Sequence, residues 1–409
     1  MRTGILIITL FFYTMASAKT IPVGAAKKYV SITAALMIAE TGDTILVDAG
    51  IYKEKNLVIR KRVVLKGINY PVLDGEKKYQ VISVRADGVV IDGFSIKHSG
   101  VSSLEDLSGI KVFSSRNVII KNNRLEDTFF GIYAENVINC IIENNQLIAF
   151  SKEEQQSGNG IHCWKSDSLR IIGNTITGHR DGIYFEFVKN SIIWRNTSTN
   201  NIRYGLHFMF SNDDSYISNI FSNNGSGVSV MYSNRIKMYN NFFEENWGDA
   251  SHGILLKEIS DGYMQGNYFS ANTSGIYMEG VNRVHMSYNT FKNNGWALKI
   301  QASCVDVVLE HNNFIGNTFD VGTNGSLVQN KFNNNYWDKY EGYDLNKDKI
   351  GDIPYRPVSM YSMIIEKYPS AMILFRSFVT TLLDKTEKII PSLTPENLKD
   401  NSPLMKRAF

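Results

Sequence analysis

A glycine followed by alternating apolar residues recurs at regular intervals through most of the 409-residue chain. Six of the eight intervals between neighbouring copies are 22 or 23 residues, and the two longer ones end at Gly160 and Gly253. The copies begin at Gly109, Gly131, Gly160, Gly182, Gly205, Gly227, Gly253 and Gly275, with Ala297 as the ninth. Such a period is typical of a solenoid, because each repeat must stack on the next to bury its apolar side.

An asparagine that follows an apolar strand recurs in the same register and carries the same two insertions. The series is Asn123, Asn145, Asn174, Asn196, Asn219, Asn241, Asn267, Asn289 and Asn313. We predict an all-β, right-handed parallel β-helix with three strands in each coil of about 22 residues. The glycines should occupy corners where a side chain would strike the next coil. Each asparagine should adopt αL geometry and bond to its equivalent one coil away.

The ends of the chain differ from the repeats. We expect residues 1–18 to be a signal peptide that exports the protein to the periplasm, because Arg2 precedes a short apolar run and Ala16-Ser17-Ala18 forms a cleavage site. An amphipathic segment over 29–40 predicts a helix within an N-terminal cap (19–43). The β-helix and a closing segment should span 44–358, and an apolar helical run over 371–383 indicates a helical tail (359–409).

Composition excludes some functions. The formal net charge is +3, and no cluster of Lys and Arg is interleaved with aromatic residues, so we expect no nucleic-acid partner. The three cysteines, Cys140, Cys163 and Cys304, have no motif spacing. We interpret them as small buried side chains, with Cys163 as a soft metal ligand the alternative.

The second and fourth residues after each glycine should point out of the solenoid, because the first and third are apolar and must face its interior. These residues form two columns, which we call the outer stripe. Its pairs are Lys111 and Phe113, Tyr133 and Glu135, His162 and Trp164, Tyr184 and Glu186, His207 and Met209, Ser229 and Met231, Leu255 and Lys257, and Tyr277 and Glu279.

Stacking of the coils should place Glu186, Met209 and Met231 in one column, with His207 on the same strand as Met209. Thioether and imidazole ligands together suit copper, Cu(I) especially. The loops of the two long coils should wall the stripe and bring His252 towards it, with His162 a further candidate. A partner-docking strip that includes Trp164 and Tyr184 is an alternative interpretation, and a sugar-binding cleft is another.

An enzymatic interpretation needs an acid and a base within reach of one substrate. Glu186 and Glu279 should lie four coils apart, about 19 Å, which is too far for a glycosidase pair. We expect no acidic cluster beside a basic residue on the stripe, and therefore no enzyme. A carbohydrate-active β-helix protein (polysaccharide lyase, epimerase or binder) remains the alternative.

Oxygen donors alternate in a segment that follows the last coil: Asp344, Asn346, Asp348 and Asp352. This spacing resembles a calcium-binding loop, although Lys349 stands at the usual glycine position and Tyr355 at the closing glutamate position. Calcium is therefore one hypothesis, and a loop of Asx turns that closes the last coil is the other.

Two segments together resemble the NosD family of periplasmic accessory proteins. They are Arg203–Tyr216 (RYGLHFMFSNDDSY) and Asn335–Asp338 (NYWD) running into Gly342–Pro357 (GYDLNKDKIGDIPYRP). The resemblance implies a non-enzymatic role beside a membrane ABC transporter (a permease and an ATPase) and a copper chaperone lipoprotein, supplying the copper sites of nitrous oxide reductase.

The resemblance carries over Arg203, Tyr204, His207, Met209 and Phe210 as the functional segment. The copper ligands themselves are our inference from the stripe. The apolar C-terminal helix would dock on the permease and hold the protein peripheral to the membrane. Its candidate contact residues are Met372, Phe375, Phe378 and Leu382.

Overall fold

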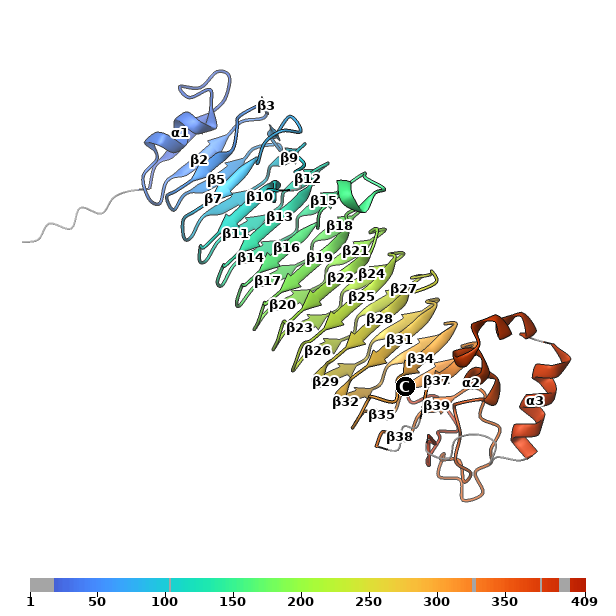
Figure 1. Cartoon of the computed structure of the whole chain (residues 1–409). Coiled ribbons are helices and arrows are strands. Elements are labelled where there is room, and N and C mark those ends of the chain that lie inside the picture. Colours follow the sequence, from blue (N-terminus) through green and yellow to red (C-terminus); the bar gives the residue numbers. More distant parts are fainter. Residues whose placement is uncertain (1–17, 103, 326–328, 376, 390–397) are drawn as a thin grey trace, which may run out of the picture.

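The chain is a long solenoid of three parallel sheets (Figure 1). The structure, a computed structural model, describes residues 18–409 except 103, 326–328, 376 and 390–397. The predicted signal peptide therefore lies almost wholly outside the described residues. A short helix, α1, lies at one end of the solenoid, and the helices α2 and α3 lie at the other. The predicted fold class is confirmed.

Each complete coil contributes one strand to each sheet, and every described strand pair is parallel. Sheet A comprises β1 (Thr20–Val23), β2 (Thr44–Val47), β5 (Val64–Gly67), β8 (Val90–Asp92), β11 (Ile119–Lys121), β14 (Ile141–Glu143), β17 (Arg170–Ile172), β20 (Ile192–Trp194), β23 (Ser215–Ile217), β26 (Lys237–Tyr239), β29 (Ser260–Gln265), β32 (Asn282–Ser287), β35 (Val308–Glu310) and β38 (Lys331–Asn333).

Sheet B comprises β3 (Ile51–Tyr52), β6 (Val72–Asp74), β9 (Ser95–Lys97), β12 (Arg124–Glu126), β15 (Gln146–Ile148), β18 (Thr175–Thr177), β21 (Thr197–Thr199), β24 (Ile220–Ser222), β27 (Phe242–Glu244), β30 (Tyr268–Ser270), β33 (Thr290–Lys292), β36 (Asn313–Ile315) and β39 (Tyr336–Trp337).

Sheet C, which carries the repeated glycines, comprises β4 (Leu57–Ile59), β7 (Ile82–Val84), β10 (Ser108–Phe113), β13 (Phe130–Glu135), β16 (Ile161–Trp164), β19 (Asp181–Glu186), β22 (Tyr204–Met209), β25 (Ser226–Met231), β28 (His252–Lys257), β31 (Ser274–Glu279), β34 (Trp296–Ile300) and β37 (Phe319–Gly322).

The asparagine series forms a continuous hydrogen-bonded ladder at the corner between sheets A and B. Each side-chain Nδ2 donates to the Oδ1 of the next member at 2.9–3.1 Å, from Asn123 as far as Asn335. The predicted ninth member was wrong by one residue, because Asn312 and not Asn313 occupies the ladder. Asn313 begins β36, where its Oδ1 accepts the backbone N–H of Ala408 at 2.9 Å.

The αL geometry predicted for these asparagines belongs to the residue before each of them. Asn122 and Asn144 have φ of 54°, whereas the ladder residues Asn123 and Asn145 do not have positive φ. The chain therefore turns one residue earlier than expected. This turn leaves the side chain of the following asparagine directed into the corner, where the next coil can receive it.

The glycines of sheet C occupy the predicted tight corners. A Cβ atom added to Gly131 would lie 2.5 Å from the carbonyl oxygen of Gly160, and one added to Gly275 would lie 2.6 Å from that of Ala297. Contacts this short with backbone require the coils to separate. These residues are therefore needed for stacking and carry no functional information.

The interior holds the first and third residues after each glycine, as predicted, and a stack of aromatic rings. The stack belongs to sheet B and runs through Phe221, Phe243, Phe269, Phe291, Phe314 and Trp337, with ring centroids 4.0–5.6 Å apart. Burial of each large ring contributes on the order of 2 kcal/mol. This packing makes the solenoid a rigid frame for its surface residues.

The N-terminal helix α1 spans Ile32–Ile38 and buries Ile32 and Ala35 against the first coil. The hydroxyl of Ser31 accepts the N–H of Ala34 at 3.1 Å and so begins the helix within the predicted segment. No helix in the part of the chain that the structure describes is long and apolar enough to cross a membrane.

The C-terminal apolar run is not one continuous helix, and that prediction was wrong. It divides into a 3-10 turn, η2 (Pro369–Leu374), and helix α3 (Phe378–Ile389), and both follow α2 (Met360–Lys367). The hydroxyl of Ser377 accepts the N–H of Thr380 at 3.3 Å, so a new helix begins at this cap. The last residues, 398–409, return to the final coils in extended form.

Candidate functional site

The strand register of sheet C assembles the outer stripe as predicted. One column runs Lys111, Tyr133, His162, Tyr184, His207, Ser229, Leu255 and Tyr277, and the other runs Phe113, Glu135, Trp164, Glu186, Met209, Met231, Lys257 and Glu279. The side chains of the two columns are far from uniformly exposed, because loops and neighbouring rings cover much of them. Several are buried, among them Tyr133, His207 and Ser229.

Met209 and Met231 are direct cross-strand partners on neighbouring coils, and Glu186 is the partner of Met209 on the other side. Neighbouring strands are about 4.8 Å apart, so the two thioethers share one small area of surface. Glu186 accepts a hydrogen bond from the hydroxyl of Tyr184 at 3.3 Å. All three side chains are partly buried. The predicted adjacency of this group is therefore present in the fold.

His207 lies two residues before Met209 on β22 and is only 6% exposed. The Tyr184 ring meets the imidazole edge-on at 5.0 Å, and the Tyr204 ring packs against it at 4.9 Å. Neither ring nitrogen of His207 has a hydrogen-bond partner among the described residues. A buried polar atom without a partner is costly, so both ring nitrogens of His207 call for an explanation.

A buried carboxylate, missed by the sequence analysis, lies beside this histidine. Asp181 is 1% exposed, and its Oδ2 lies 3.7 Å from Nδ1 of His207. Its Oδ1 lies 3.6 Å from Nε of Arg203 and accepts the backbone N–H of Tyr204 at 3.3 Å. Asp181 precedes Gly182 and is not a member of the two columns of the outer stripe, so the expectation of no acidic cluster on the stripe did not consider it.

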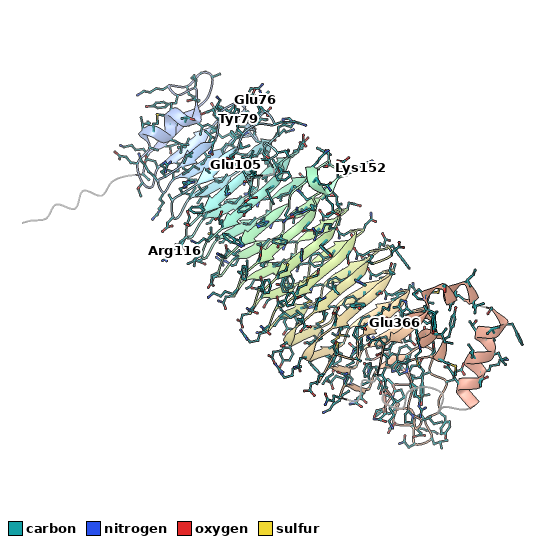
Figure 2. All side chains as sticks on the ribbon, viewed as in Figure 1. Glu76, Tyr79, Glu105, Arg116, Lys152 and Glu366 are labelled. Carbon is teal, nitrogen blue, oxygen red and sulfur yellow. The ribbon has the colours of Figure 1, made fainter. Side chains whose placement is uncertain are left out.

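The first long coil holds this cluster from the side. Its loop contains the short turn η1 (Glu154–Gln156), and Lys152, labelled in Figure 2, marks where the loop projects from the solenoid. Glu154 Oε2 lies 4.0 Å from Arg203, and Asn159 Oδ1 accepts a hydrogen bond from Arg180 at 3.2 Å. This loop walls the stripe as predicted.

His162 is held apart from His207 although both lie in one column. Its ring is stacked between Tyr133 at 4.5 Å and Tyr184 at 4.8 Å, so the Tyr184 ring separates the two imidazoles. Its Nδ1 lies 3.0 Å from Nδ2 of Asn159. Burial, and then the charge of Arg180, lower the pKa of His162 to about 3. The ring is therefore neutral, and it stands two coils from His207.

His252 begins β28, at the opposite end of its strand from the residue that pairs with Met231. Its ring packs near Tyr277, with centroids 5.1 Å apart. Burial, and then the charge of Lys299, lower the pKa of His252 to about 4. The second long coil thus carries His252 onto the outer face, but the structure does not bring it to the methionine pair.

Three aromatic residues line the edge of the stripe beside Glu186, Met209 and Met231. Phe187, Phe210 and Tyr232 follow these residues directly and are 39–45% exposed. Their rings stack in succession at 5.2 Å and are nearly parallel. All three have φ between 50° and 54°, which is unfavourable for bulky side chains. We call these three residues the aromatic strip.

Other coils place smaller or more polar residues at the same corner, such as Ser114, Asn136, Lys165 and Gly280. At this corner the aromatic side chains with this strained geometry therefore follow Glu186 and the two methionines. Strain retained at one surface position is a reason to suspect function there. Of the strip, only Phe210 was named from the sequence; the other two share its offset from the repeated glycine and were detectable in this way.

Trp164 lies one coil before Glu186 in the same column, and Nζ of Lys165 lies 4.1 Å from its ring. The C-terminal candidates lie far from this group, at the end of the solenoid. Met372, Phe375, Phe378 and Leu382 are 40–79% exposed. Val379 at 50% and Ile373 at 89% are exposed beside them, and the sequence analysis did not name these two. Together they give η2 and α3 an apolar surface.

The calcium hypothesis gains no support from the closing loop. The carboxylate of Asp344 accepts the backbone N–H groups of Asp348 and Lys349, and Asp352 accepts that of Leu345. Asn346 and Asp348 each accept an N–H two residues later, as in Asx turns. No group of three His, Cys, Asp or Glu side chains arranged for a metal occurs among the described residues.

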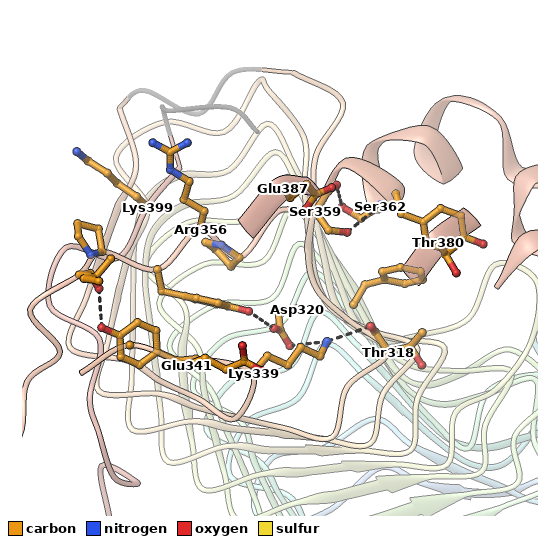
Figure 3. Close-up of a pocket in the computed structure, with 18 of the residues that line it drawn as sticks. Thr318, Asp320, Lys339, Glu341, Arg356, Ser359, Ser362, Thr380, Glu387 and Lys399 are labelled. Carbon is orange, nitrogen blue, oxygen red and sulfur yellow. Dashed lines mark hydrogen bonds and ion pairs between the residues drawn. The ribbon is translucent and has the colours of Figure 1, made fainter. Parts of the chain in front are cut away.

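A hollow of about 870 Å³ lies between the last coil, the closing loop and the C-terminal helices (Figure 3). Asp320 lies at its base, where Oδ2 accepts from the hydroxyl of Tyr355 at 3.0 Å and Oδ1 lies 3.5 Å from Lys339. Its described lining includes no His, Met or Cys. Cys140, Cys163 and Cys304 are free and buried. Neither the hollow nor the three cysteines add soft ligands to the outer stripe.

Comparison with known structures supports the fold alone. The A-module of the mannuronan C-5 epimerase AlgE6 of Azotobacter vinelandii matches with a TM-score of 0.54 at 12% identity, over 74% of this chain and 92% of that one. PfbA, a surface adhesin of Streptococcus pneumoniae, matches with a TM-score of 0.52 at 14% identity, over 72% of this chain and 87% of that one. An enzyme and an adhesin thus share this architecture, so it does not specify activity.

Sequence comparison is more specific. The proteins described as "Probable ABC transporter binding protein NosD" from Pseudomonas aeruginosa and Stutzerimonas stutzeri are each 25% identical to this chain. The alignments span 370 residues (86% of both chains) and 355 residues (82% of this chain, 80% of the other). The family model described as "Periplasmic copper-binding protein (NosD)" matches residues 148–342, which include the methionine pair, His207 and the aromatic strip. This chain is therefore similar to the NosD relatives along most of its length, and its middle part matches the model of that family.

Proposed function

We propose that this protein binds Cu(I) as cargo on the outer stripe and relays it, in the periplasm, for assembly of the copper sites of nitrous oxide reductase. The observation that carries the proposal is the cross-strand pairing of Met209 with Met231, two residues along the strand from His207. Thioether sulfur and neutral imidazole are ligands that favour Cu(I) over the harder divalent ions. The family description, a periplasmic copper-binding protein, supports the same cargo.

The site suits transfer better than storage. Met209, Met231 and Glu186 project from a rigid sheet and are partly buried, so an incoming ligand set can reach them from one side only. Glu186 is a weaker ligand for Cu(I) than sulfur. A small set of soft ligands on an open face allows a partner to add or remove the ion without unfolding either protein.

The partners in this proposal are the permease and ATPase of an ABC transporter, a copper chaperone lipoprotein and nitrous oxide reductase itself. The names of the relatives support an ABC transporter. We assign the aromatic strip with Trp164 to a partner that exchanges the ion. The exposed apolar residues of η2 and α3 we assign to the permease, which would hold the protein peripheral to the membrane.

A carbohydrate-active enzyme is disfavoured by burial. Asp181 and His207 together resemble an acid–base pair, but they are 1% and 6% exposed. A polysaccharide must contact the group that moves its proton. A panel of acidic and neutral polysaccharides tests this alternative directly, and lyase or epimerase activity would overturn the accessory role.

The deciding experiment is a competition titration of Cu(I) against a colorimetric chelator. Wild type is compared with a variant that combines His207→Ala, Met209→Ala and Met231→Ala. Met372→Ala is the matched control, because it removes an exposed thioether distant from the stripe. Tight binding lost only in the triple variant supports the site. Equal binding by all three proteins, or by none, contradicts it.

A further inference from the structure

Asp181 divides its two carboxylate oxygens between different neighbours. Oδ1 faces Nε of Arg203 at 3.6 Å and accepts the N–H of Tyr204 at 3.3 Å, and Oδ2 faces Nδ1 of His207 at 3.7 Å. Glu154 lies 4.0 Å from Arg203 and therefore holds that guanidinium from the loop side. The carboxylate is thus fixed through one oxygen while the other remains directed at the imidazole.

The polar atoms of this group are poorly satisfied as they stand. Oδ2 of Asp181, both ring nitrogens of His207 and the hydroxyl of Ser229 have no hydrogen-bond partner among the described residues, and all are buried. Ser229 is the cross-strand partner of His207 on the next coil. Buried polar atoms without partners are costly, so their clustering indicates a site that is completed by something else.

A histidine that binds a metal through one ring nitrogen usually donates the other N–H to a carboxylate, which fixes both the tautomer and the ring orientation. Here the Tyr184 and Tyr204 rings limit rotation of the imidazole, and Asp181 faces one nitrogen only. We propose that Asp181 is a positioning residue for the copper site: its Oδ2 receives the Nδ1–H of His207, so that Nε2 is the nitrogen presented to Cu(I). This inference rests on the proposed function.

The same arrangement suggests a role for most residues of the functional segment that resembles the NosD family. Arg203 and Tyr204 act on the ion indirectly, by anchoring Asp181, while His207 and Met209 contact it. Asp181, which lies 26 positions before His207 on the preceding coil and was not considered in the sequence analysis, thus becomes part of the site. The coil that precedes the copper ligands would set the orientation of one of them.

The test combines two measurements on wild type and Asp181→Asn. Imidazole ¹⁵N chemical shifts of the copper-free protein report the tautomer of each of the seven histidines, with His207→Gln to assign the signal. Cu(I) affinity is measured by chelator competition. Asp213→Asn is the matched control, because Asp213 lies on a nearby corner and pairs with Arg235. Thermal melting of each variant establishes that it is folded.

We expect the Nδ1–H tautomer of His207 in wild type, its loss in Asp181→Asn, and a 10- to 100-fold weaker Cu(I) affinity in that variant alone, the range typical of such partners. An Nε2–H tautomer in wild type overturns the positioning role. So does a normal affinity in Asp181→Asn while wild type binds Cu(I). Absence of Cu(I) binding in wild type would instead overturn the proposed function, and this inference with it.

Discussion

Asp400 takes the place of the next asparagine in the ladder that ends at Asn335. Its Oδ2 accepts both the backbone N–H and the side-chain Nδ2 of Asn335 at 3.0 Å, and also Nε1 of Trp337 at 3.0 Å. The carboxylate is fully buried. The C-terminal tail therefore satisfies donors that would otherwise have no partner at the open end of the solenoid.

Replacing Asp400 with Ala should destabilise the protein markedly. The substitution removes three buried hydrogen bonds, and the loss of each costs roughly 1 kcal/mol. Nδ2 of Asn335 would still donate to the carbonyl of Leu309. We expect the free energy of unfolding to fall by about 3 kcal/mol, measured by urea denaturation. Asp400→Asn keeps an acceptor oxygen and should retain most of the stability; a loss equal to that of the alanine variant would contradict this account.

The second prediction concerns His179, which occupies the first position of a second ladder, between sheets B and C. Its backbone N–H donates to Oδ1 of Asn201, and the asparagines at this corner continue to Asn317. Both ring nitrogens are buried without partners. Burial lowers the pKa of His179 to about 4, whereas an unfolded chain titrates near 6.5.

The unfolded state binds the proton more tightly than the folded state. The contribution of neutral His179 to the free energy of unfolding is therefore fully present above pH 6.5, and on the order of 3 kcal/mol is lost as the pH falls towards 4. His179→Asn should continue the ladder and remove this dependence. We would measure urea unfolding at pH 7.5 and pH 4.5 for both proteins. An equal fall in stability in the variant would show that other groups cause the acid sensitivity.

Asp214 should behave in the opposite way. Burial raises the pKa of Asp214 well above its usual value, and the nearby charges of Asp213 and Asp167 act in the same direction. The carboxyl group therefore contributes stability below about pH 4 that is lost as the pH rises. At pH 7.5 the neutral isostere in Asp214→Asn should be at least as stable as wild type, by thermal melting.

The adjacent residue provides a control of opposite sign. The side-chain hydrogen bond from Arg235 lowers the pKa of Asp213, so that its contribution is present at neutral pH and lost in acid. Asp213→Asn should therefore give no gain at pH 7.5. A stabilising effect from both substitutions would indicate a general benefit of removing negative charge rather than relief of a buried acid.

The repeat made the strand register of the solenoid predictable, because alternation fixes which residues face outward and stacking fixes which share a column. This was sufficient to place Met209 beside Met231. It was insufficient for Asp181, because alternation holds only within a straight strand and this residue lies at the corner before Gly182. Nor could it place Asp400, whose contact with Asn335 spans 65 residues and has no repeated counterpart.

The last prediction separates strain from docking on the aromatic strip. Phe210 has φ of 50° and is 39% exposed. Asparagine tolerates this geometry, whereas other L residues lose roughly 1–2 kcal/mol in it. Relief of this strain should stabilise the variant, whereas loss of the ring stacking should destabilise it by about 1 kcal/mol. Phe210→Asn should therefore change stability by less than about 1 kcal/mol, by urea denaturation, yet weaken co-purification with the ABC transporter or chaperone.

Tyr288 offers the matched control for this substitution. It has φ of 55°, is 41% exposed and stacks on His311 at 5.3 Å, but it lies at the corner between sheets A and B, away from the stripe. Tyr288→Asn makes the same change in backbone strain and ring stacking, so it should leave co-purification intact. If both variants lose the partner equally, the aromatic strip is not the docking surface, and its strained rings serve the fold alone.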